Sequence, residues 1–181
     1  DMLNIKSHLL PMADSPTTLM AKAVALPGQE ANVLVGELSI DNSDEEIERL
    51  YLEPAVVAGP EVISTIEHAD TIILSAGSFM TSIMPSLLVA NIRDAINQST
   101  APLILVINIK EEHLGGGLVL TFDKQIELLE KAGVRALDHI LWPANRDLSV
   151  QDLAKYPITQ VDMKPCERGL HNEKVLRAAI F

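Results

Sequence analysis

The segment best suited to chemistry is a loop of small residues between two apolar stretches. Residues 75–78 read Ser-Ala-Gly-Ser, and hydroxyl side chains follow at 81 and 82. If a helix begins at this loop, its first backbone N–H groups are unpaired and attract negative charge. A glycine there lets the backbone approach a ligand closely. This interpretation assigns phosphate binding to Ser75, Ala76, Gly77, Ser78 and Thr81.

The same pattern has a purely structural interpretation. Ser78 would cap the helix while Gly77 forms a tight turn. Junctions of a strand, a glycine and a helix are common, and this loop is not a P-loop. The pattern alone favours the structural interpretation, and the phosphate site stays open as the alternative.

A second polar position, Asn108, follows an apolar run at residues 103–107. An amide at the carboxyl end of a strand can read a base or a sugar hydroxyl, because it both donates and accepts hydrogen bonds. The alternative, which we favour from the residue alone, is that Asn108 satisfies the loop backbone. The glycines at 115–117 lack the Lys and the strand-to-helix setting of a phosphate cradle, so we expect a flexible loop.

No group of residues specifies a metal centre or a catalytic pair. The five histidines are scattered and show no i, i+4 pair on a helix. Cys166 has basic neighbours at 164 and 168, but no base can be assigned to it. The acidic runs at 44–46 and 111–112 are most simply solvated turns. We therefore predict no metal ligands and assign no catalytic residue.

Alternating strands and helices in the later part of the chain are expected to position the candidate phosphate-binding loop and Asn108. Short apolar strands are predicted at residues 71–74, 103–109 and 137–141, and helices at 60–68, 80–98, 122–132 and 173–179. Such alternation is typical of a parallel sheet covered on both faces. Residues 17–24, 32–40 and 47–52 instead alternate apolar and polar side chains, which predicts a small antiparallel layer.

The length suits one domain over residues 1–181, and the strand and helix patterns predict an α/β fold with a β-rich subregion at 17–53. Hydrophobic residues make up 48% of the chain and aromatic residues 3%, so the core must be aliphatic. The net charge is −11, from 14 basic and 25 acidic side chains, which argues against nucleic acid as a partner. The apolar runs fall short of the roughly 20 residues that span a bilayer. We expect a cytoplasmic protein without a membrane partner.

Four longer motifs occur in a fixed order. They are LLPMADSPTTLMAKA at residues 9–23, VLVGELSID at 33–41, IERLYLEPA at 47–55 and ADTIILSAGSFMTSIMPSLLVANIRDAI at 69–96. Asn108 and residues 134–143 and 166–178 fit the same order. The order resembles the CofD-like superfamily, specifically its bacterial gluconeogenesis-factor branch of the UPF0052 type.

The resemblance implies a three-layer α/β/α, Rossmann-like fold that binds a nucleotide. The gluconeogenesis-factor branch implies a regulatory protein that binds a UDP-sugar and is linked to carbon metabolism and cell-wall morphogenesis, without an established reaction. The alternative is a phospholactate transferase, which moves a phospholactyl group from a guanosine diphosphate donor to a deazaflavin precursor and uses Mg²⁺.

In either case the resemblance places the nucleotide at the same residues. Its diphosphate is expected at Gly77, Ser78 and Thr81, and its base or sugar near Asn108, with Pro11 and Asp14 in support. The expected partner is this small nucleotide ligand. Mg²⁺ is expected only for the transferase, and a homodimer is among the expected assemblies.

The chain departs from the family in two ways. Residues 75–78 replace the family's Gly-Pro-Gly-Ser and keep only the Gly and the Ser nearest the helix. The family's glycine-rich first strand–loop–helix and its acidic Asp-Asp-Gly-Gly segment have no counterpart here. The chain begins at Asp1, just before the Leu-Pro-Met motif, so we expect a processed or shortened chain that forms an incomplete family domain with half of the ligand site.

Overall fold

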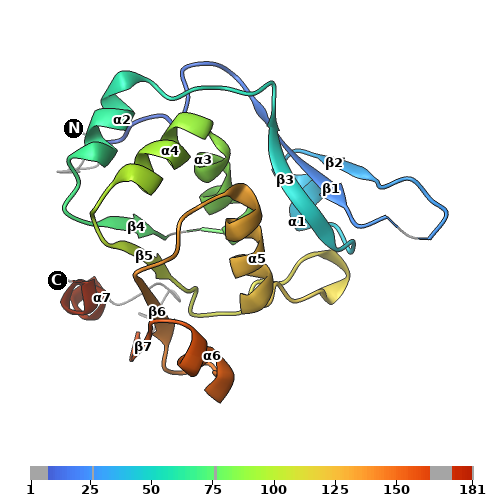
Figure 1. Ribbon diagram of the computed structural model, residues 1–181. Helices are drawn as coiled ribbons and strands as arrows, with labels where there is room; N and C mark the ends of the chain where they lie inside the picture. The colour runs from blue at the N-terminus through green and yellow to red at the C-terminus, as the bar shows by residue number, and fades with distance from the viewer. Residues whose placement is uncertain (1–7, 26, 76, 164–172, 181) are drawn as a thin grey trace, which may run out of the picture.

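Two sheets and the helices around them make up the computed structural model, which describes residues 8–25, 27–75, 77–163 and 173–180 (Figure 1). The smaller sheet is antiparallel. Its central strand β1 (Thr18–Ala23) pairs with β2 (Val33–Val35) on one side and β3 (Ile47–Glu53) on the other. The predicted antiparallel layer is therefore confirmed.

The strand predicted at residues 32–40 is wrong over its second half. The chain leaves β2 at Gly36, where φ is 82°, and then forms the short helix α1 (Glu37–Asp41). Positive φ is accessible to glycine but disfavoured for other residues, so Gly36 can end the strand abruptly. The helical turn places Ile40 in the core, with no exposed surface. Burial of Ile40 decides the local structure against the strand-like alternation.

The larger sheet is parallel, with the order β4-β5-β6-β7. It consists of β4 (Ile72–Leu74), β5 (Leu103–Val106), β6 (His139–Pro143) and β7 (Ile158–Val161). The first three strands were predicted from their apolar runs. The strand β7 was not, because Thr159 and Gln160 are exposed and interrupt its apolar pattern.

All four residues of β5 are buried, and they alternate between two cores. Leu103 and Leu105 join a large core with the helices α4 (Ala90–Gln98) and α5 (Phe122–Ala132). Ile104 and Val106 join a smaller core against α7 (Glu173–Ile180). Figure 1 shows α4 and α5 on one side of the sheet and α7 on the other. Helices thus cover both faces, as predicted.

The long helix predicted at residues 80–98 is interrupted. It consists of a π-helical segment η1 (Phe79–Ile83), then α3 (Met84–Leu88), and finally α4. Val89 lies between α3 and α4 with an extended backbone and a fully buried side chain. The side chain of Asn91 accepts from the Ala58 N–H and donates to the Ala58 carbonyl, at 2.9 Å each, which holds the start of α4. Apolar spacing continues across this break, so periodicity could not reveal it.

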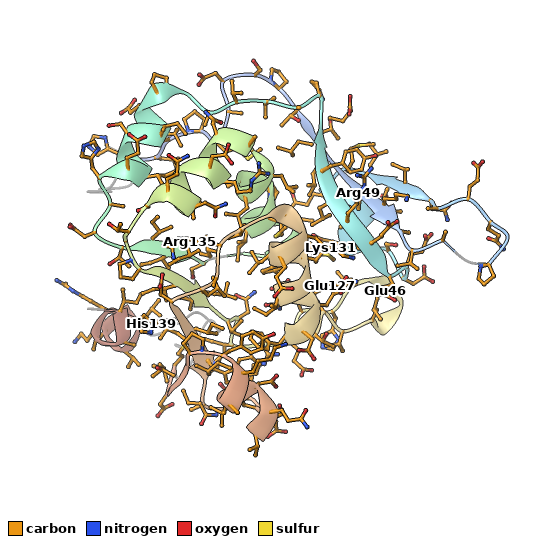
Figure 2. All side chains as sticks on the ribbon, viewed as in Figure 1. Glu46, Arg49, Glu127, Lys131, Arg135 and His139 are labelled. Carbon is orange, nitrogen blue, oxygen red and sulfur yellow. The ribbon has the colours of Figure 1, made fainter. Side chains whose placement is uncertain are left out.

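The remaining helices fit the sequence signals for helix ends. The helix α2 (Pro60–Glu67) carries Pro at its first turn, and α5 begins at the capping Thr121 and stops at Gly133, where φ is 79°. A sixth helix, α6 (Val150–Lys155), was not predicted. The amino edge of the sheet is closed by Arg135, labelled in Figure 2, which donates to the carbonyls of Ile96 and Ala101 and to Asp138.

We predict that Leu105→Ala lowers the free energy of unfolding by about 2–5 kcal/mol, because it leaves a cavity in the fully packed sheet. Leu38→Ala is the matched control, since Leu38 is 78% exposed. We expect this control to change stability by less than about 0.5 kcal/mol. Urea denaturation of both variants measures the difference, and equal losses would contradict the two-core description.

Candidate functional site

The candidate site lies at the carboxyl edge of the parallel sheet. There β4, β5 and β6 end at Leu74, Val106 and Pro143, and each leads into a loop. Carboxyl ends of parallel strands share one edge, which is where open α/β sheets bind ligands. The loops that follow β4 and β5 are hydrogen-bonded to each other through Gly77 and Asn108.

Asn108 joins the two loops through its side-chain amide. Its Nδ2 donates to the Gly77 carbonyl at 3.0 Å and to Oε1 of Glu112 at 2.5 Å. The structure therefore brings together Gly77, Ser78 and Asn108, three of the residues that the sequence singled out. In this state Asn108 satisfies a loop backbone, which agrees with the interpretation favoured from the residue alone.

The backbone requires glycine at position 77, independently of any ligand. Its φ is 102°, and a Cβ built on it would lie 2.6 Å from the Cβ of Ser82. Both the backbone conformation and the space exclude a larger side chain. This geometry supports the tight-turn interpretation.

An anion already occupies the start of η1, and it is a side chain. The Phe79 N–H donates to Oε2 of Glu112 at 2.8 Å, and Ser78 Oγ lies 3.4 Å from the same oxygen. Burial raises the pKa of the Glu112 carboxyl, the hydrogen bonds from Phe79, Asn108 and Ser78 oppose this shift, and the charge of Asp41 adds to it. Glu112 is thus a partly buried carboxylate at the position predicted for phosphate.

The interpretation of residues 111–112 as a solvated turn is therefore wrong for Glu112. Glu111 is exposed, whereas Glu112 turns back onto the Gly77 loop. Nothing in a Glu-Glu pair shows which carboxylate points inward. Its distance of 34 residues from Ser78 also hides the contact from any local pattern.

Thr81 faces a second carboxylate. Its side chain is buried, and Oγ1 lies 3.2 Å from both carboxylate oxygens of Asp41, the last residue of α1. Ser75 is partly buried at the start of the loop, and Ala76 lies outside the described residues. Asp41 and Glu112 are hence two acidic groups on either side of η1 that sequence reasoning did not assign to the site.

Arg146 places a positive charge at this carboxyl edge, and the sequence did not indicate it. Its Nη1 donates to the Asn108 carbonyl at 3.0 Å, and Nη2 lies 4.0 Å from Oε1 of Glu111. The guanidinium carbon lies 5.1 Å from the centre of the Trp142 ring, a cation–π contact. Burial lowers the pKa of Arg146, and Glu111 and Glu112 oppose this shift. The guanidinium stays protonated near neutral pH, as arginine does in proteins.

Of the two supporting residues, Asp14 lies near another helix. A Cβ on Gly59, which precedes α2, would meet Asp14 Oδ2 at 2.9 Å, so this carboxylate packs against the start of α2. Pro11 is exposed. Among the hydrogen bonds of the described residues, none joins Pro11 or Asp14 to the Gly77 loop.

The glycine run at 115–117, where we expect a flexible loop, packs at Gly115 against Asn42, which follows α1. It forms a single 3₁₀ turn, η2 (Gly115–Gly117). A Cβ on Gly115 would lie 1.8 Å from the carbonyl oxygen of Asn42, so only glycine allows this close approach of two backbones. The run therefore supports the loop that carries Glu112.

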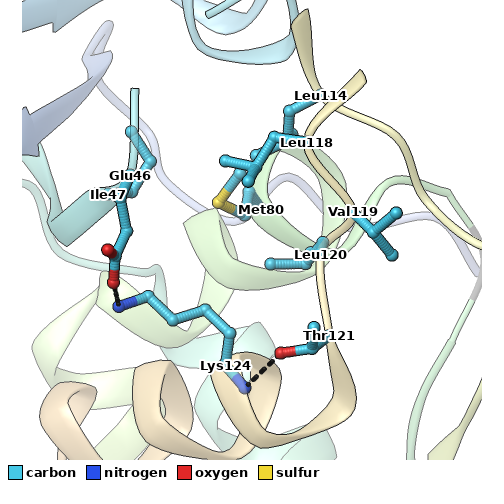
Figure 3. Close-up of a pocket in the computed structure, with 9 residues that line it drawn as sticks. All are labelled: Glu46, Ile47, Met80, Leu114, Leu118, Val119, Leu120, Thr121 and Lys124. Atoms are coloured by element: carbon cyan, nitrogen blue, oxygen red, sulfur yellow. Dashed lines mark hydrogen bonds and ion pairs between the residues drawn. The ribbon is translucent and has the colours of Figure 1, made fainter. Parts of the chain in front are cut away.

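A cavity of about 220 Å³ borders η1 at Met80. Its wall is mainly apolar, with Leu114, Leu118 and Leu120 contributed by the β5–α5 loop (Figure 3). At its rim the Lys124 ammonium lies 3.1 Å from Glu46, an ion pair that Figure 3 marks. This apolar lining does not suit a diphosphate.

The described residues contain neither a metal-ligand cluster nor a membrane-spanning helix. Within the part of the chain that the structure describes, no three or more His, Cys, Asp or Glu side chains cluster as they would around a metal ion. Cys166 lies outside that part. None of the described helices has the length and apolar character required to cross a bilayer.

Known proteins resemble this chain, and the matches to a family model and to one relative extend over nearly its whole length. The family model described as 2-phospho-L-lactate transferase CofD matches residues 1–176. A Pasteurella multocida protein whose name contains the words gluconeogenesis factor is 30% identical, over 99% of this chain and 57% of that protein. The gluconeogenesis factor of Listeria monocytogenes is 32% identical, over 60% of this chain and 32% of that protein.

The fold agrees with a solved structure. A crystal structure of a UPF0052 family member from Bacillus halodurans superposes with a TM-score of 0.65 at 25% sequence identity. The match covers 98% of this chain and 54% of that one. The chain therefore spans about half the length of the Pasteurella and Bacillus proteins that it matches.

We predict that Glu112→Gln changes stability in a pH-dependent way. A raised native pKa means that the folded state favours the protonated carboxyl, so this contribution to stability is lost as the pH rises through that pKa. The wild-type protein should therefore lose free energy of unfolding relative to Glu112→Gln between about pH 4 and pH 7. Urea denaturation at both pH values measures this difference. Exposed Glu30→Gln is the control for removing one charge, and a wild-type-to-Glu112→Gln difference that does not change with pH would contradict the burial of Glu112.

Proposed function

The chain belongs to the CofD family, and on that premise we propose that the protein binds the diphosphate of a UDP-sugar at the carboxyl edge of the parallel sheet. Relatives that carry the name gluconeogenesis factor support a role in carbon metabolism. We propose in addition that this role is regulatory and is linked to cell-wall morphogenesis. Because the chain covers 57% of the Pasteurella relative, this role is proposed for the whole protein.

The observation that carries the proposal is the Glu112 carboxylate on the Phe79 N–H, beside Arg146. An internal carboxylate accepts from the same kinds of donor that a phosphate uses, namely a backbone N–H, a hydroxyl and an amide. The site therefore already has the donors for an anion. The burial that raises the Glu112 pKa also shields this position partly from water, which strengthens its electrostatic interactions.

Binding is proposed to proceed by exchange of one anion for another. A phosphate oxygen would replace the Glu112 carboxylate on Phe79 N–H and Ser78 Oγ, because the two negative groups repel each other at one set of donors. Departure of Glu112 would also release one N–H of Asn108, while the other holds the Gly77 carbonyl. Arg146 would supply the positive charge that a diphosphate needs in this acidic chain.

We propose binding without chemistry as the main role. The relatives are named as factors, and the site residues assigned here hold and orient an anion. We propose a cytoplasmic protein whose partner is the nucleotide and not a membrane, and the net charge of −11 argues against nucleic acid. A homodimer remains a prediction for the whole protein.

The description of the matching family supports one alternative, a phospholactate transferase. Mg²⁺ commonly takes one or two carboxylates and completes its shell with phosphate oxygens and water. Asp41 and Glu112, the two carboxylates beside η1, are the residues that would hold it. Bound there, Mg²⁺ would neutralise charge on a guanosine diphosphate donor. Preference for guanosine over uridine nucleotides, and only with Mg²⁺, would favour this alternative.

The geometry also determines which variants test the site cleanly. Gly77→Val would block the close approach of a ligand to the backbone of this loop. Because φ is 102° and a Cβ at this position would lie 2.6 Å from Ser82, the variant should also strain the loop. Substitutions of Glu112 and Arg146 change charge at the site without that strain.

We predict opposite effects of these two substitutions on UDP-glucose binding by the full protein, measured by calorimetric titration. Glu112→Gln should tighten binding about fivefold or more, since it removes a competing negative charge. Arg146→Gln should weaken it about tenfold, since it removes a charge-assisted contact. The affinity of wild-type protein should rise as the pH falls towards the raised Glu112 pKa, and that of Glu112→Gln should not.

The control is Lys155→Gln, which removes one charge from exposed α6. Thermal unfolding of each variant verifies the fold. Absence of UDP-glucose binding to wild-type protein would refute the proposed function. An affinity that neither Glu112→Gln nor Arg146→Gln changes would refute the proposed site.

A further inference from the structure

A second cavity of about 340 Å³ lies away from the carboxyl edge, between the small sheet and the helices. Strand β3 forms one wall, and α3, α4 and α5 form the others. The volume falls within the roughly 300–1,000 Å³ of small-molecule sites. We call it the basic cleft, after its three charged residues Arg49, Arg93 and Lys131.

The basic cleft has an unusual charge for this chain. The net charge is −11, yet the described residues that line the cleft include three cations and no acidic side chain. Figure 2 shows Arg49 on β3 and Lys131 on α5, with Glu127 beside Lys131. A concave site lined by one sign of charge focuses its field and attracts the opposite sign.

The three cations are held by contacts that a ligand could replace. Lys131 Nζ lies 2.5 Å from Glu127 and 3.1 Å from the Glu48 carbonyl, and Arg93 Nη2 lies 3.4 Å from Asp94. These carboxylates are about half exposed, and such surface pairs contribute roughly 0–1 kcal/mol. Arg49 stacks over the Tyr51 ring at 5.2 Å and makes no salt bridge with any described residue.

The floor of the cleft is apolar. Leu88 and Ala132 line it and are partly exposed, whereas Leu50, Met84 and Leu128, which also line it, are buried. A bare inorganic ion would leave this floor wet, whereas a ligand with a flat apolar body would cover it. Two guanidinium groups and one ammonium match the charge of a phosphate monoester better than that of a single carboxylate.

We propose that the basic cleft binds a small phosphate monoester with a flat apolar body. Arg49, Arg93 and Lys131 hold the phosphate, and Leu88 and Ala132 pack against the body. None of these residues belongs to the nucleotide site described above, so this proposal stands independently of the proposed function.

The test titrates the full protein with phenyl phosphate and follows backbone amides by NMR. Saturable shifts are expected at Tyr51 and Leu88, which line the cleft. The double variant Arg49→Gln/Lys131→Gln should weaken phenyl phosphate binding by about tenfold or more. Lys155→Gln removes one charge elsewhere and should leave the affinity unchanged.

Three further titrations separate charge from shape. Inorganic phosphate tests charge alone, phenol tests the ring alone, and benzoate tests a single negative charge on the same ring. Phenyl phosphate should bind more tightly than all three. Shifts confined to Ser78 and Asn108, equal affinity in the double variant, or equal binding of phenol would overturn the proposal. Because the shifts are mapped on wild-type protein, the result stands even if the double variant does not fold.

Discussion

Burial of β5 on both faces is the constraint on which the rest of the structure depends. Alternate side chains of Leu103–Val106 enter two separate cores, so helices must cover the sheet from both sides. Parallel strands joined through helices satisfy this requirement, and they place the ends of β4, β5 and β6 at one edge. The loops that carry Gly77, Asn108 and Arg146 therefore meet for reasons of packing. The position of the site therefore follows from how helices cover the core, and the loops supply its polar residues.

Glu112 places a partly buried carboxylate at that edge of the sheet. A carboxylate bound to the Phe79 N–H satisfies a helix start that would otherwise lack a partner, and burial makes the charged form less favourable than in water. The same donors could serve a phosphate, so under the proposed function the internal carboxylate and a nucleotide would compete for one position. A site built in this way would hold its shape without ligand and would respond to ligand charge and to pH.

The sequence predicted the parallel core well, because continuous apolar strands and capped helices such as α5 carry local signals. It failed where tertiary contacts decide the structure. Burial of Ile40 turns an alternating stretch into α1, buried Val89 splits a periodic helix, and exposed Thr159 and Gln160 hide β7. In the site, Gly77, Ser78 and Asn108 were found from their places after strands, and whether they bind phosphate stays a prediction. Glu112 and Arg146 were missed because their contacts join loops 34 and 38 residues apart.

The central claim is that a nucleotide diphosphate replaces Glu112 at the start of η1. A crystal structure of the full protein with a bound UDP-sugar tests it most directly. We predict a phosphate oxygen within hydrogen-bond distance of the Phe79 N–H, with the Glu112 side chain turned away and Arg146 beside the diphosphate. A bound nucleotide with Glu112 still on the Phe79 N–H, and the diphosphate elsewhere, would contradict it.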